Sequence, residues 1–210
     1  MVHRPINSTF IAPIPKVDKP SNFDDYRPIS LCNCLYKIIS KVISKRIKRI
    51  LSKNISGEQF GFLDGRQIHE GIDVAQEGLH SMKTRNIGGV VVKIDLSKAY
   101  DRVNWLYIHM LLTHLGFCMD FIRWTMSCIS SVSFALLING AATKKIHAQQ
   151  ELRQGCPLSP LLFLLVAEGL SKSSKWPRRM DTLGAFQLRE TCTSHTCSLW
   201  MAFLSFAMAP

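Results

Sequence analysis

One aspartate, Asp95, stands where metal-dependent displacement chemistry at phosphorus needs a carboxylate. It ends the run Val90–Ile94, which consists mostly of β-branched residues and predicts a buried strand. The tip of such a strand is a rigid position from which carboxylate oxygens can hold a hard cation. In a two-metal site, two cations clamp the attacking and leaving oxygens of an in-line displacement. The alternative for Asp95, taken by itself, is that it caps a helix.

The elements that would position Asp95 are indicated by hydrophobic periodicity. In chain order, the pattern predicts an extended edge segment at Thr9–Pro15, a polar loop at Lys16–Tyr26, helices at Leu35–Leu51 and Ile68–Met82, a strand at Val90–Asp95, helices at Trp105–Leu115 and Met119–Ser130, strands at Val132–Ile138 and Lys144–Gln149, and a helix at Leu158–Leu170. Asn33 is expected to cap the first helix, and Asn139-Gly140 to turn the hairpin. Because strands and helices are mixed without regular βαβ alternation, the predicted fold class is α+β.

The first long helix has a strongly basic face. Lys and Arg outnumber Asp and Glu by 26 to 15, which gives a formal charge of +11. The residues on this face that we expect to contact nucleic acid are Lys37, Lys41, Lys45, Arg46, Lys48 and Arg49. Cations near phosphates release condensed counterions, so such a face favours a polyanionic partner. The alternative is an ordinary solvated surface.

Cysteine usage and hydropathy predict the compartment. The seven cysteines are scattered without the spacing of a disulfide framework, which favours a reducing compartment. Two apolar runs, residues 158–167 and 198–210, are shorter than the roughly 20 residues that a membrane span needs. No apolar stretch of signal-peptide length is present near Met1. We therefore expect a soluble intracellular protein with no membrane partner.

Six short blocks in a fixed order carry a family resemblance. They are Ile14–Lys16, Tyr26–Leu31, Glu58–Phe62, Gly65–Gln67, Lys93–Asp101 and Leu152–Pro160. In these blocks and their spacing, residues 7 to about 170 resemble the reverse transcriptase domain of LINE (non-LTR) retrotransposons, most closely the plant group. A related polymerase, such as a group II intron maturase, is an alternative, but the fourth and fifth blocks are more similar to LINE sequences.

The resemblance implies a fold and an activity. The fold would be a right-hand polymerase, with fingers at residues 1–87, a partial palm at 88–170 and no thumb. The activity would be that of an RNA-directed DNA polymerase, which uses an RNA template, a DNA primer and deoxynucleotides. Its two-metal reaction would require Mg²⁺.

The resemblance also assigns roles to residues beside the strand end. Asp95 matches the first metal-binding aspartate, and the Leu96 backbone would lie near the triphosphate. Tyr100 resembles the steric gate, an aromatic wall that excludes a ribose 2′-hydroxyl; the alternative is a core aromatic residue. Asp101 also matches the family pattern and is expected to be structural.

Four further positions are assigned to substrate by the same resemblance. Lys16 and Arg27 would bind the incoming triphosphate, because guanidinium suits bidentate phosphate contact. Gln154 and Gly155 would lie against the template and the nascent base pair, with glycine allowing close approach. The alternatives are an ion pair of Arg27 with Asp24 or Asp25, and ordinary loop roles for Lys16 and Gln154.

Two departures from the family pattern bear on activity. Cys156 occupies a position that is usually acidic, which affects the expected template geometry. The aromatic-x-Asp-Asp hairpin that supplies the remaining catalytic carboxylates is absent. One aspartate cannot hold two cations. A second hypothesis is therefore a catalytically inactive nucleic-acid-binding remnant of this domain.

The last segment, residues 171–210, is expected to be an aberrant tail. Back-translation in a shifted frame from Ser194 permits Ser-His-Leu-Leu-Phe-Val-Asp-Gly, which is similar to the strand that leads into the missing hairpin. This pattern predicts a frameshift after about residue 170. Cys192, His195 and Cys197 lack a fourth ligand and are not expected to bind a metal.

Overall fold

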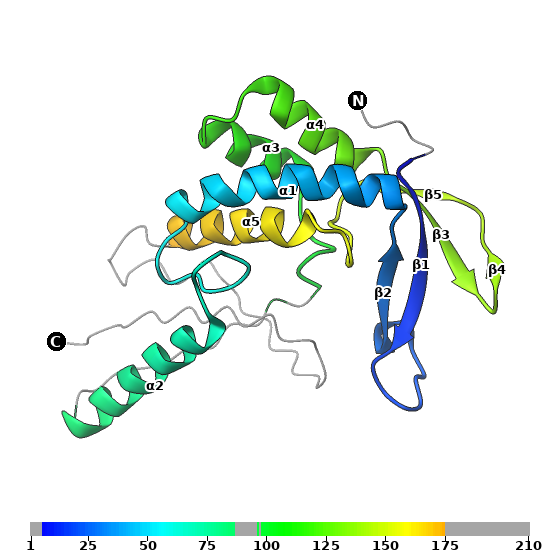
Figure 1. The fold of residues 1–210 in the computed structure, drawn as a ribbon. Helices are drawn as coiled ribbons and strands as arrows, with labels where there is room; N and C mark the ends of the chain where they lie inside the picture. Colours follow the sequence, from blue (N-terminus) through cyan, green and yellow to red (C-terminus); the bar gives the residue numbers. More distant parts are fainter. Residues whose placement is uncertain (1–5, 87–95, 97, 175–210) are drawn as a thin grey trace.

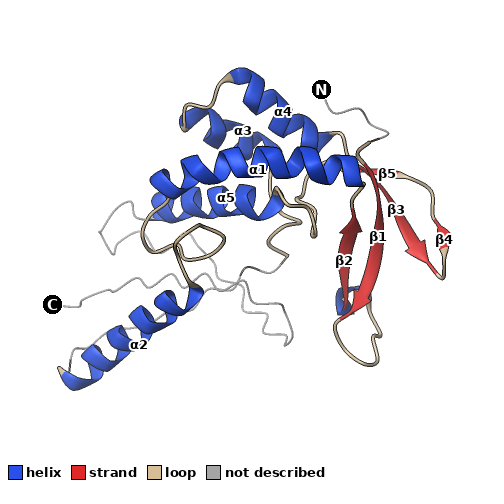
Figure 2. Ribbon diagram, in the orientation of Figure 1, coloured by secondary structure: helices blue, strands red, loops and turns tan. Residues whose placement is uncertain are grey.

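The computed structural model describes residues 6–86, 96 and 98–174, and within them a small sheet lies beside a group of helices (Figure 1). The elements are β1 (Ser8–Pro15), η1 (Phe23–Asp25), β2 (Tyr26–Leu31), α1 (Cys34–Asn54), α2 (Ile68–Thr84), α3 (Trp105–His114), α4 (Met119–Ser130), β3 (Ser133–Ile138), β4 (Ala141–Ala142), β5 (Ile146–His147) and α5 (Ser159–Ser174). The α-helices and the strands lie in different parts of the molecule, and the short helix η1 lies with the strands, as Figure 2 shows. The predicted α+β class is confirmed.

The sheet is built around β1, which corrects the prediction of an edge segment. The strand order is β2-β1-β3-β4, and β5 also pairs with β3. β1 pairs with β3 in parallel only over Ser8–Ile11, whereas it pairs with β2 antiparallel over Phe10–Pro15. The prolines of β1 thus lie beyond the part that has partners on both sides. Proline lacks an N–H group, so this half of the strand has the single neighbour that proline tolerates.

Two other parts of the sheet differ from the prediction. The sequence pattern predicted a loop at Lys16–Tyr26 and then a helix from Leu35, with no strand between them. In the structure Tyr26–Leu31 forms β2, which completes a hairpin with β1 through the η1 turn. The expected return strand at Lys144–Gln149 is confirmed only over Ile146–His147 (β5), which pairs antiparallel with β3, and a second short strand, β4, pairs with β3 ahead of it. The tight turn itself is confirmed, because Asn139 and Gly140 both have positive φ values, 50° and 81°.

Helix α1 begins where the sequence predicted, and the Asn33 side chain accepts a hydrogen bond from the Leu35 backbone N–H at 2.9 Å. The apolar repeat of this helix, Leu35, Ile38, Ile39, Val42, Ile43, Ile47, Ile50 and Leu51, predicts its buried face. The prediction is confirmed at Ile43, Ile47 and Leu51, and the other buried residues are Tyr36, Ser40 and Ser44. Three residues of the predicted apolar face are exposed instead: Leu35, Ile38 and Val42. The buried serines donate to carbonyl oxygens of their own helix, so they carry no unsatisfied hydroxyl.

Helix α5 runs through the centre of the core. Its consecutive residues Leu161–Leu165 are all buried, which is typical of a helix that has neighbours on several sides. It contacts α1 and α3, and α3 contacts α4. None of the described helices combines the length and apolarity needed to cross a membrane.

The loop between α1 and α2 is fixed by one arginine and one glutamate. The Arg66 guanidinium donates to the carbonyl oxygens of Ile55, Ser56 and Gln59. The buried Glu168 carboxylate of α5 accepts from the Ser56 hydroxyl at 2.8 Å and from its backbone N–H at 3.2 Å. This loop determines the direction in which α2 leaves the helical body (Figure 1).

Candidate active site

Asp95, the expected metal ligand, lies outside the described residues, as does the predicted strand Val90–Asp95. The chain is described again at Leu96, which is 39% exposed, and from Lys98 onward. The geometry of the site is therefore that of the residues following Asp95 and of their neighbours. Across the described part of the chain, no group of three or more His, Cys, Asp and Glu residues has the arrangement of a metal site.

Tyr100 is joined to the segment that precedes Gln154. Its carbonyl oxygen accepts a hydrogen bond from the Leu152 N–H at 2.9 Å, and the Val103 carbonyl accepts from the Glu151 N–H at 3.2 Å. The Tyr100 ring is half-buried, with its centroid 5.1 Å from that of Phe163 in α5. Burial raises the pKa of the Tyr100 phenol, so it is neutral at physiological pH. One side of the ring packs on the core while part of it stays accessible.

Gln154 and Gly155 lie against the backbone of β2. The Gln154 carbonyl oxygen accepts a hydrogen bond from the Ser30 N–H at 2.9 Å. Gly155 has a φ of +93°, and a Cβ at this position would lie 3.0 Å from the Ser30 carbonyl oxygen. Glycine is required here both for its backbone conformation and for its close approach to Ser30. The closest contact of Gly155 is thus with the chain's own β2.

A buried arginine, Arg153, and a buried tyrosine, Tyr36, support this loop from behind, and neither was assigned a role from the sequence. Arg153 is only 6% exposed, and its guanidinium carbon lies 3.9 Å from the centroid of the Tyr36 ring. The Cys128 carbonyl oxygen accepts from Arg153 at 3.3 Å and from the Tyr36 hydroxyl at 3.4 Å. The same hydroxyl lies 3.2 Å from the Cys156 sulfur. The sequence feature that could have indicated this cluster is Arg153, because it directly precedes Gln154-Gly155.

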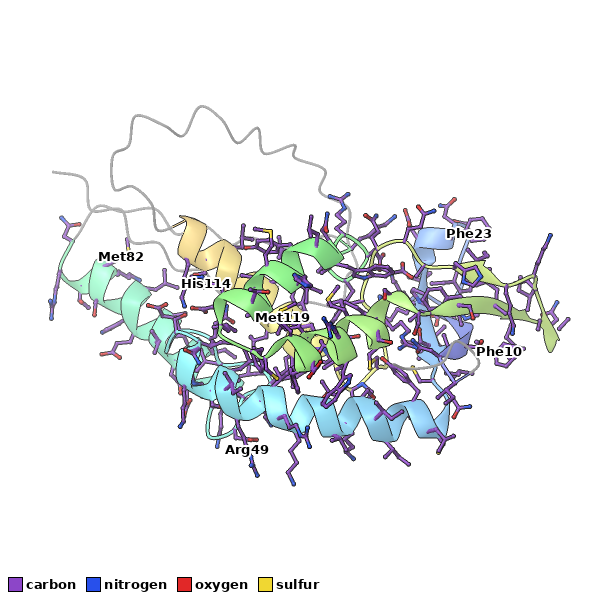
Figure 3. The ribbon with its side chains drawn as sticks, turned by 90° about the horizontal axis from the view of Figure 1, so that it is seen from above. Phe10, Phe23, Arg49, Met82, His114 and Met119 are labelled. Carbon is purple, nitrogen blue, oxygen red and sulfur yellow. The ribbon has the colours of Figure 1, made fainter. Side chains whose placement is uncertain are left out.

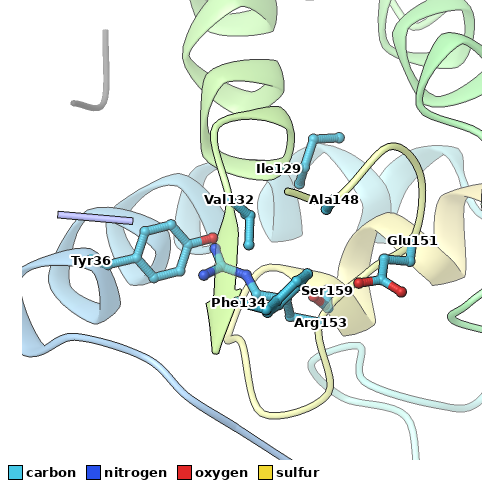
Figure 4. Close-up of a pocket in the computed structure, with 8 residues that line it drawn as sticks. All are labelled: Tyr36, Ile129, Val132, Phe134, Ala148, Glu151, Arg153 and Ser159. Atoms are coloured by element: carbon cyan, nitrogen blue, oxygen red, sulfur yellow. The ribbon is translucent and has the colours of Figure 1, made fainter. Parts of the chain in front are cut away.

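A cavity of about 10 Å³, close to the space of one water molecule, lies beside this cluster (Figure 4). Its lining includes Tyr36, Arg153, Ser159 and the half-buried Glu151. Burial raises the pKa of the Cys128 thiol and of the Tyr36 phenol. Both groups are therefore protonated at neutral pH and are not nucleophiles; the Tyr36 hydroxyl acts here through its hydrogen bonds.

Asp24, in the turn between β1 and β2, is contacted by two lysines. The Lys98 ammonium lies 2.8 Å from the Asp24 carboxylate, and the Lys16 ammonium donates to the Asp24 carbonyl oxygen at 2.7 Å. The hydrogen bond and charge of Lys98 lower the pKa of Asp24. Lys98, only three residues beyond Asp95, therefore connects the segment that follows Asp95 to the hairpin.

Arg27 does not have the ion pair that was its alternative. Asp24 binds Lys98, and the Asp25 carboxylate accepts from the backbone N–H groups of Ser21 and Asn22 at 2.8 and 2.9 Å. Among the described residues, no ion pair joins Arg27 to either carboxylate, and the buried Arg27 Nε has no hydrogen-bond partner. Arg27 is half-buried in β2, three residues before Ser30.

The basic face of α1 is largely free for contact. Lys37, Lys41, Lys45, Arg46 and Arg49 are exposed. Figure 3 shows Arg49 pointing away from the other helices. Lys48 differs from these residues, because its ammonium forms an ion pair with Asp64 in the loop before α2.

Comparison with known proteins identifies the family. The sequence matches the family described as "Reverse transcriptase (RNA-dependent DNA polymerase)" over residues 14–186. The chain is 30% identical over 155 residues to the transposon TX1 uncharacterized 149 kDa protein of Xenopus laevis, an alignment covering 74% of the chain and 12% of that protein. It is 26% identical over 160 residues to the retrovirus-related Pol polyprotein from type-1 retrotransposable element R2 of Popillia japonica, with coverages of 75% and 22%.

A third relative is the retrovirus-related Pol polyprotein from type-2 retrotransposable element R2DM of Drosophila melanogaster, 24% identical over 160 residues. That alignment covers 76% of the chain and 15% of the relative. The chain thus spans only a small part of each of these proteins. The family match covers most of the described residues and continues past the end of α5. The chain belongs to the reverse transcriptase (RNA-dependent DNA polymerase) family, as a domain related to those of non-LTR retrotransposons.

Proposed function

We propose that the chain forms the fingers, at residues 1–87, and part of the palm, at 88–170, of a retrotransposon polymerase that copies RNA into DNA. In this proposal Asp95 binds Mg²⁺, the Leu96 backbone faces the triphosphate and Tyr100 is the steric gate. The carboxylate of Asp95 suits Mg²⁺, which prefers hard oxygen ligands. An intracellular location, where an RNA template and deoxynucleotides are present, belongs to the same proposal.

The observation that carries the proposal is the junction of Tyr100 with Gln154 and Gly155. Leu152 hydrogen-bonds the Tyr100 backbone, and two residues later Gln154 hydrogen-bonds Ser30. A residue assigned to the sugar and two assigned to the base pair are therefore connected through one short backbone segment. Such a segment supplies the rigidity that a substrate site requires.

Arg27 and Lys16 are proposed to bind the triphosphate. Arg27 keeps a buried Nε without a partner among the described residues, so its guanidinium is not committed to a carboxylate. Lys16 must leave the Asp24 carbonyl oxygen to reach a phosphate. That exchange costs little, because the hydrogen bond is exposed and a phosphate is a stronger acceptor for an ammonium.

The second candidate function is nucleic-acid binding without catalysis. It is favoured by the absence from this sequence of an aromatic-x-Asp-Asp hairpin. Two cations about 3.5–4 Å apart need bridging and flanking carboxylates that one aspartate cannot provide. The exposed lysines and arginines of α1 are sufficient for binding by counterion release.

Primer extension separates the two candidates. The full chain is incubated with an RNA template, an annealed DNA primer, deoxynucleotides and Mg²⁺, in parallel with the Asp95→Asn variant. Because this sequence lacks the carboxylates of the aromatic-x-Asp-Asp hairpin, we expect no extension by either protein, which is the outcome of the second candidate, together with salt-dependent binding of the primer–template by both. Extension that Asp95→Asn abolishes would overturn the binding-only candidate. Absence of binding at low salt would overturn both.

The segment 171–210 is proposed to be a frame-shifted tail, starting near the end of α5. Helix α5 includes Ser171–Ser174, so the start of this tail falls within the last turn of the helix. Sequencing the locus tests the proposal, because the shifted frame must contain codons for the Asp-Gly pair of the expected strand. Genomic sequence without these codons would refute it.

A further inference from the structure

One aromatic side chain is presented to solvent almost completely. Phe23, in the η1 turn, is 98% exposed, whereas the next most exposed large apolar residue in the described part of the chain, Leu106, is 67% exposed. Figure 3 shows Phe23 on the side of the molecule opposite α1. The turn that carries it is at the end of the β1–β2 hairpin that points away from the helices (Figure 1).

The backbone that carries Phe23 is held in place by several hydrogen bonds. The Asp25 carboxylate accepts from the Ser21 and Asn22 N–H groups at 2.8 and 2.9 Å. The Tyr26 N–H donates to the Phe23 carbonyl oxygen, and the Lys16 N–H donates to that of Asp25 at 2.7 Å. The ring is therefore exposed on an ordered turn and not on a frayed loop.

The surroundings of the ring favour one class of ligand. Its neighbours in the turn are polar or charged, so no apolar rim surrounds Phe23 of the kind that encloses a hot spot between proteins. The charges of the turn balance: Lys16 and Lys19 stand against Asp18, Asp24 and Asp25, and Lys98 pairs with Asp24. The Asp25 carboxylate is occupied by backbone N–H groups. An exposed aromatic face without an apolar rim is the kind of surface on which proteins stack unpaired bases.

We propose that Phe23 is a stacking site for an unpaired base of single-stranded nucleic acid. This inference rests on the proposed function, since it adds a base contact for the RNA strand that the proposed domain would hold. It involves a residue that is separate from Lys16, Arg27, Tyr100 and the α1 basic face. Stacking does not depend on which base is present, because every base has a π-face.

The test compares the original chain and two variants on two strands. The full chain and Phe23→Ala are titrated against single-stranded RNA of about 12 nucleotides, and against an abasic strand of the same length, with fluorescence anisotropy as the readout. Leu106→Ala, which removes an exposed apolar side chain from α3, is the matched control. Thermal unfolding confirms that each variant is folded, since an exposed ring contributes little to stability.

We expect Phe23→Ala to bind the normal strand about fivefold or more weakly, and the abasic strand as tightly as the original chain does. The dependence of affinity on salt should not change, because no charge is removed. Equal weakening on both strands would overturn base stacking. Unchanged affinity for both strands would overturn the nucleic-acid assignment and leave a protein contact as the role of Phe23. If the original chain binds neither strand, the proposed function fails together with this inference.

Discussion

Replacement of Gly155 by alanine tests how the loop that carries Gln154 is held on β2. The φ of +93° places an alanine in left-handed backbone, which costs roughly 1–2 kcal/mol. The added Cβ would also lie 3.0 Å from the Ser30 carbonyl oxygen, so the loop must retreat. Retreat weakens the hydrogen bond between the Ser30 N–H and the Gln154 carbonyl oxygen, which is worth about 0.5–1.5 kcal/mol. The expected loss in the free energy of unfolding is about 2–3 kcal/mol.

Two other glycines separate these contributions. Gly65 also has a positive φ, +77°, but a Cβ there meets nothing within 4 Å. Gly65→Ala should therefore lower the free energy of unfolding only by the cost of the left-handed backbone, roughly 1–2 kcal/mol. Gly57 has neither a positive φ nor a close neighbour, so Gly57→Ala should be neutral or slightly stabilising.

Urea denaturation followed by circular dichroism gives the free energy of unfolding of each variant. The expected order of stability is Gly57→Ala, then Gly65→Ala, then Gly155→Ala. A Gly155→Ala variant that is as stable as Gly65→Ala would show that the loop does not press on β2. Gln154 would then not be held in a fixed position by its contact with β2.

Three further perturbations follow from the contacts of the described residues. Arg66→Ala removes a guanidinium from three carbonyl oxygens and should lower the free energy of unfolding by about 2 kcal/mol, whereas no loss in urea denaturation would contradict the loop arrangement. Burial, and to a smaller extent the negative charge of Asp101, raises the pKa of Glu151. The folded state therefore binds this proton more tightly than the unfolded state does, and the free energy of unfolding should fall as pH rises through the raised pKa. Glu151→Gln should remove this part of the pH dependence in thermal unfolding, and an unchanged profile would argue against burial. Replacing both Lys41 and Lys45 by Gln should reduce the slope of log affinity against log salt by about 2. Lys48→Gln, which breaks the ion pair with Asp64, should leave the slope nearly unchanged. A change in slope per residue that is equal in the two variants would contradict the Lys48–Asp64 ion pair.

The helices were predictable because their signals are local. Asn33 caps α1, and α4 begins and ends at the predicted residues, Met119 and Ser130. The hairpin turn at Asn139 needed only the preference of Asn-Gly for positive φ. In each case the residues that determine the structure are neighbours in the sequence.

Strand β2 and the inward face of α1 depend on distant partners. Pro28 disfavours a strand locally, but the pairing of β2 with β1 accommodates it opposite Pro13. The apolar repeat predicted the buried positions in the second half of α1, at Ile43, Ile47 and Leu51, whereas in the first half packing buries Tyr36 and leaves Leu35 and Ile38 exposed. The sequence pattern predicts that a helix is amphipathic, but which face is buried depends on the residues that it meets.

The candidate site was predictable only through the family resemblance. The contacts of Tyr100 with Leu152, and of Ser30 with Gln154, join segments far apart in the chain. No periodicity connects them, so the order of the blocks was the only available signal. The resemblance supplied no role for Arg153, because its partners are a ring face and a carbonyl oxygen, which no spacing rule describes.

The structure changes the significance of Cys156. Its side chain is 4% exposed and contacts the Tyr36 hydroxyl, so it faces the protein interior and not the outer side of the loop. An acidic residue at this position would place a carboxylate beside that hydroxyl and close to the Arg153 cluster. With a thiol instead, the described contacts of the buried Arg153 charge are the Tyr36 ring face and the Cys128 carbonyl oxygen. A desolvated cation–π contact stabilises by about 2 kcal/mol, which offsets only part of the several kcal/mol that burial of an ion costs. The effect of Cys156 is therefore on the support of the loop, because it changes how Arg153 is compensated behind Gln154 and Gly155.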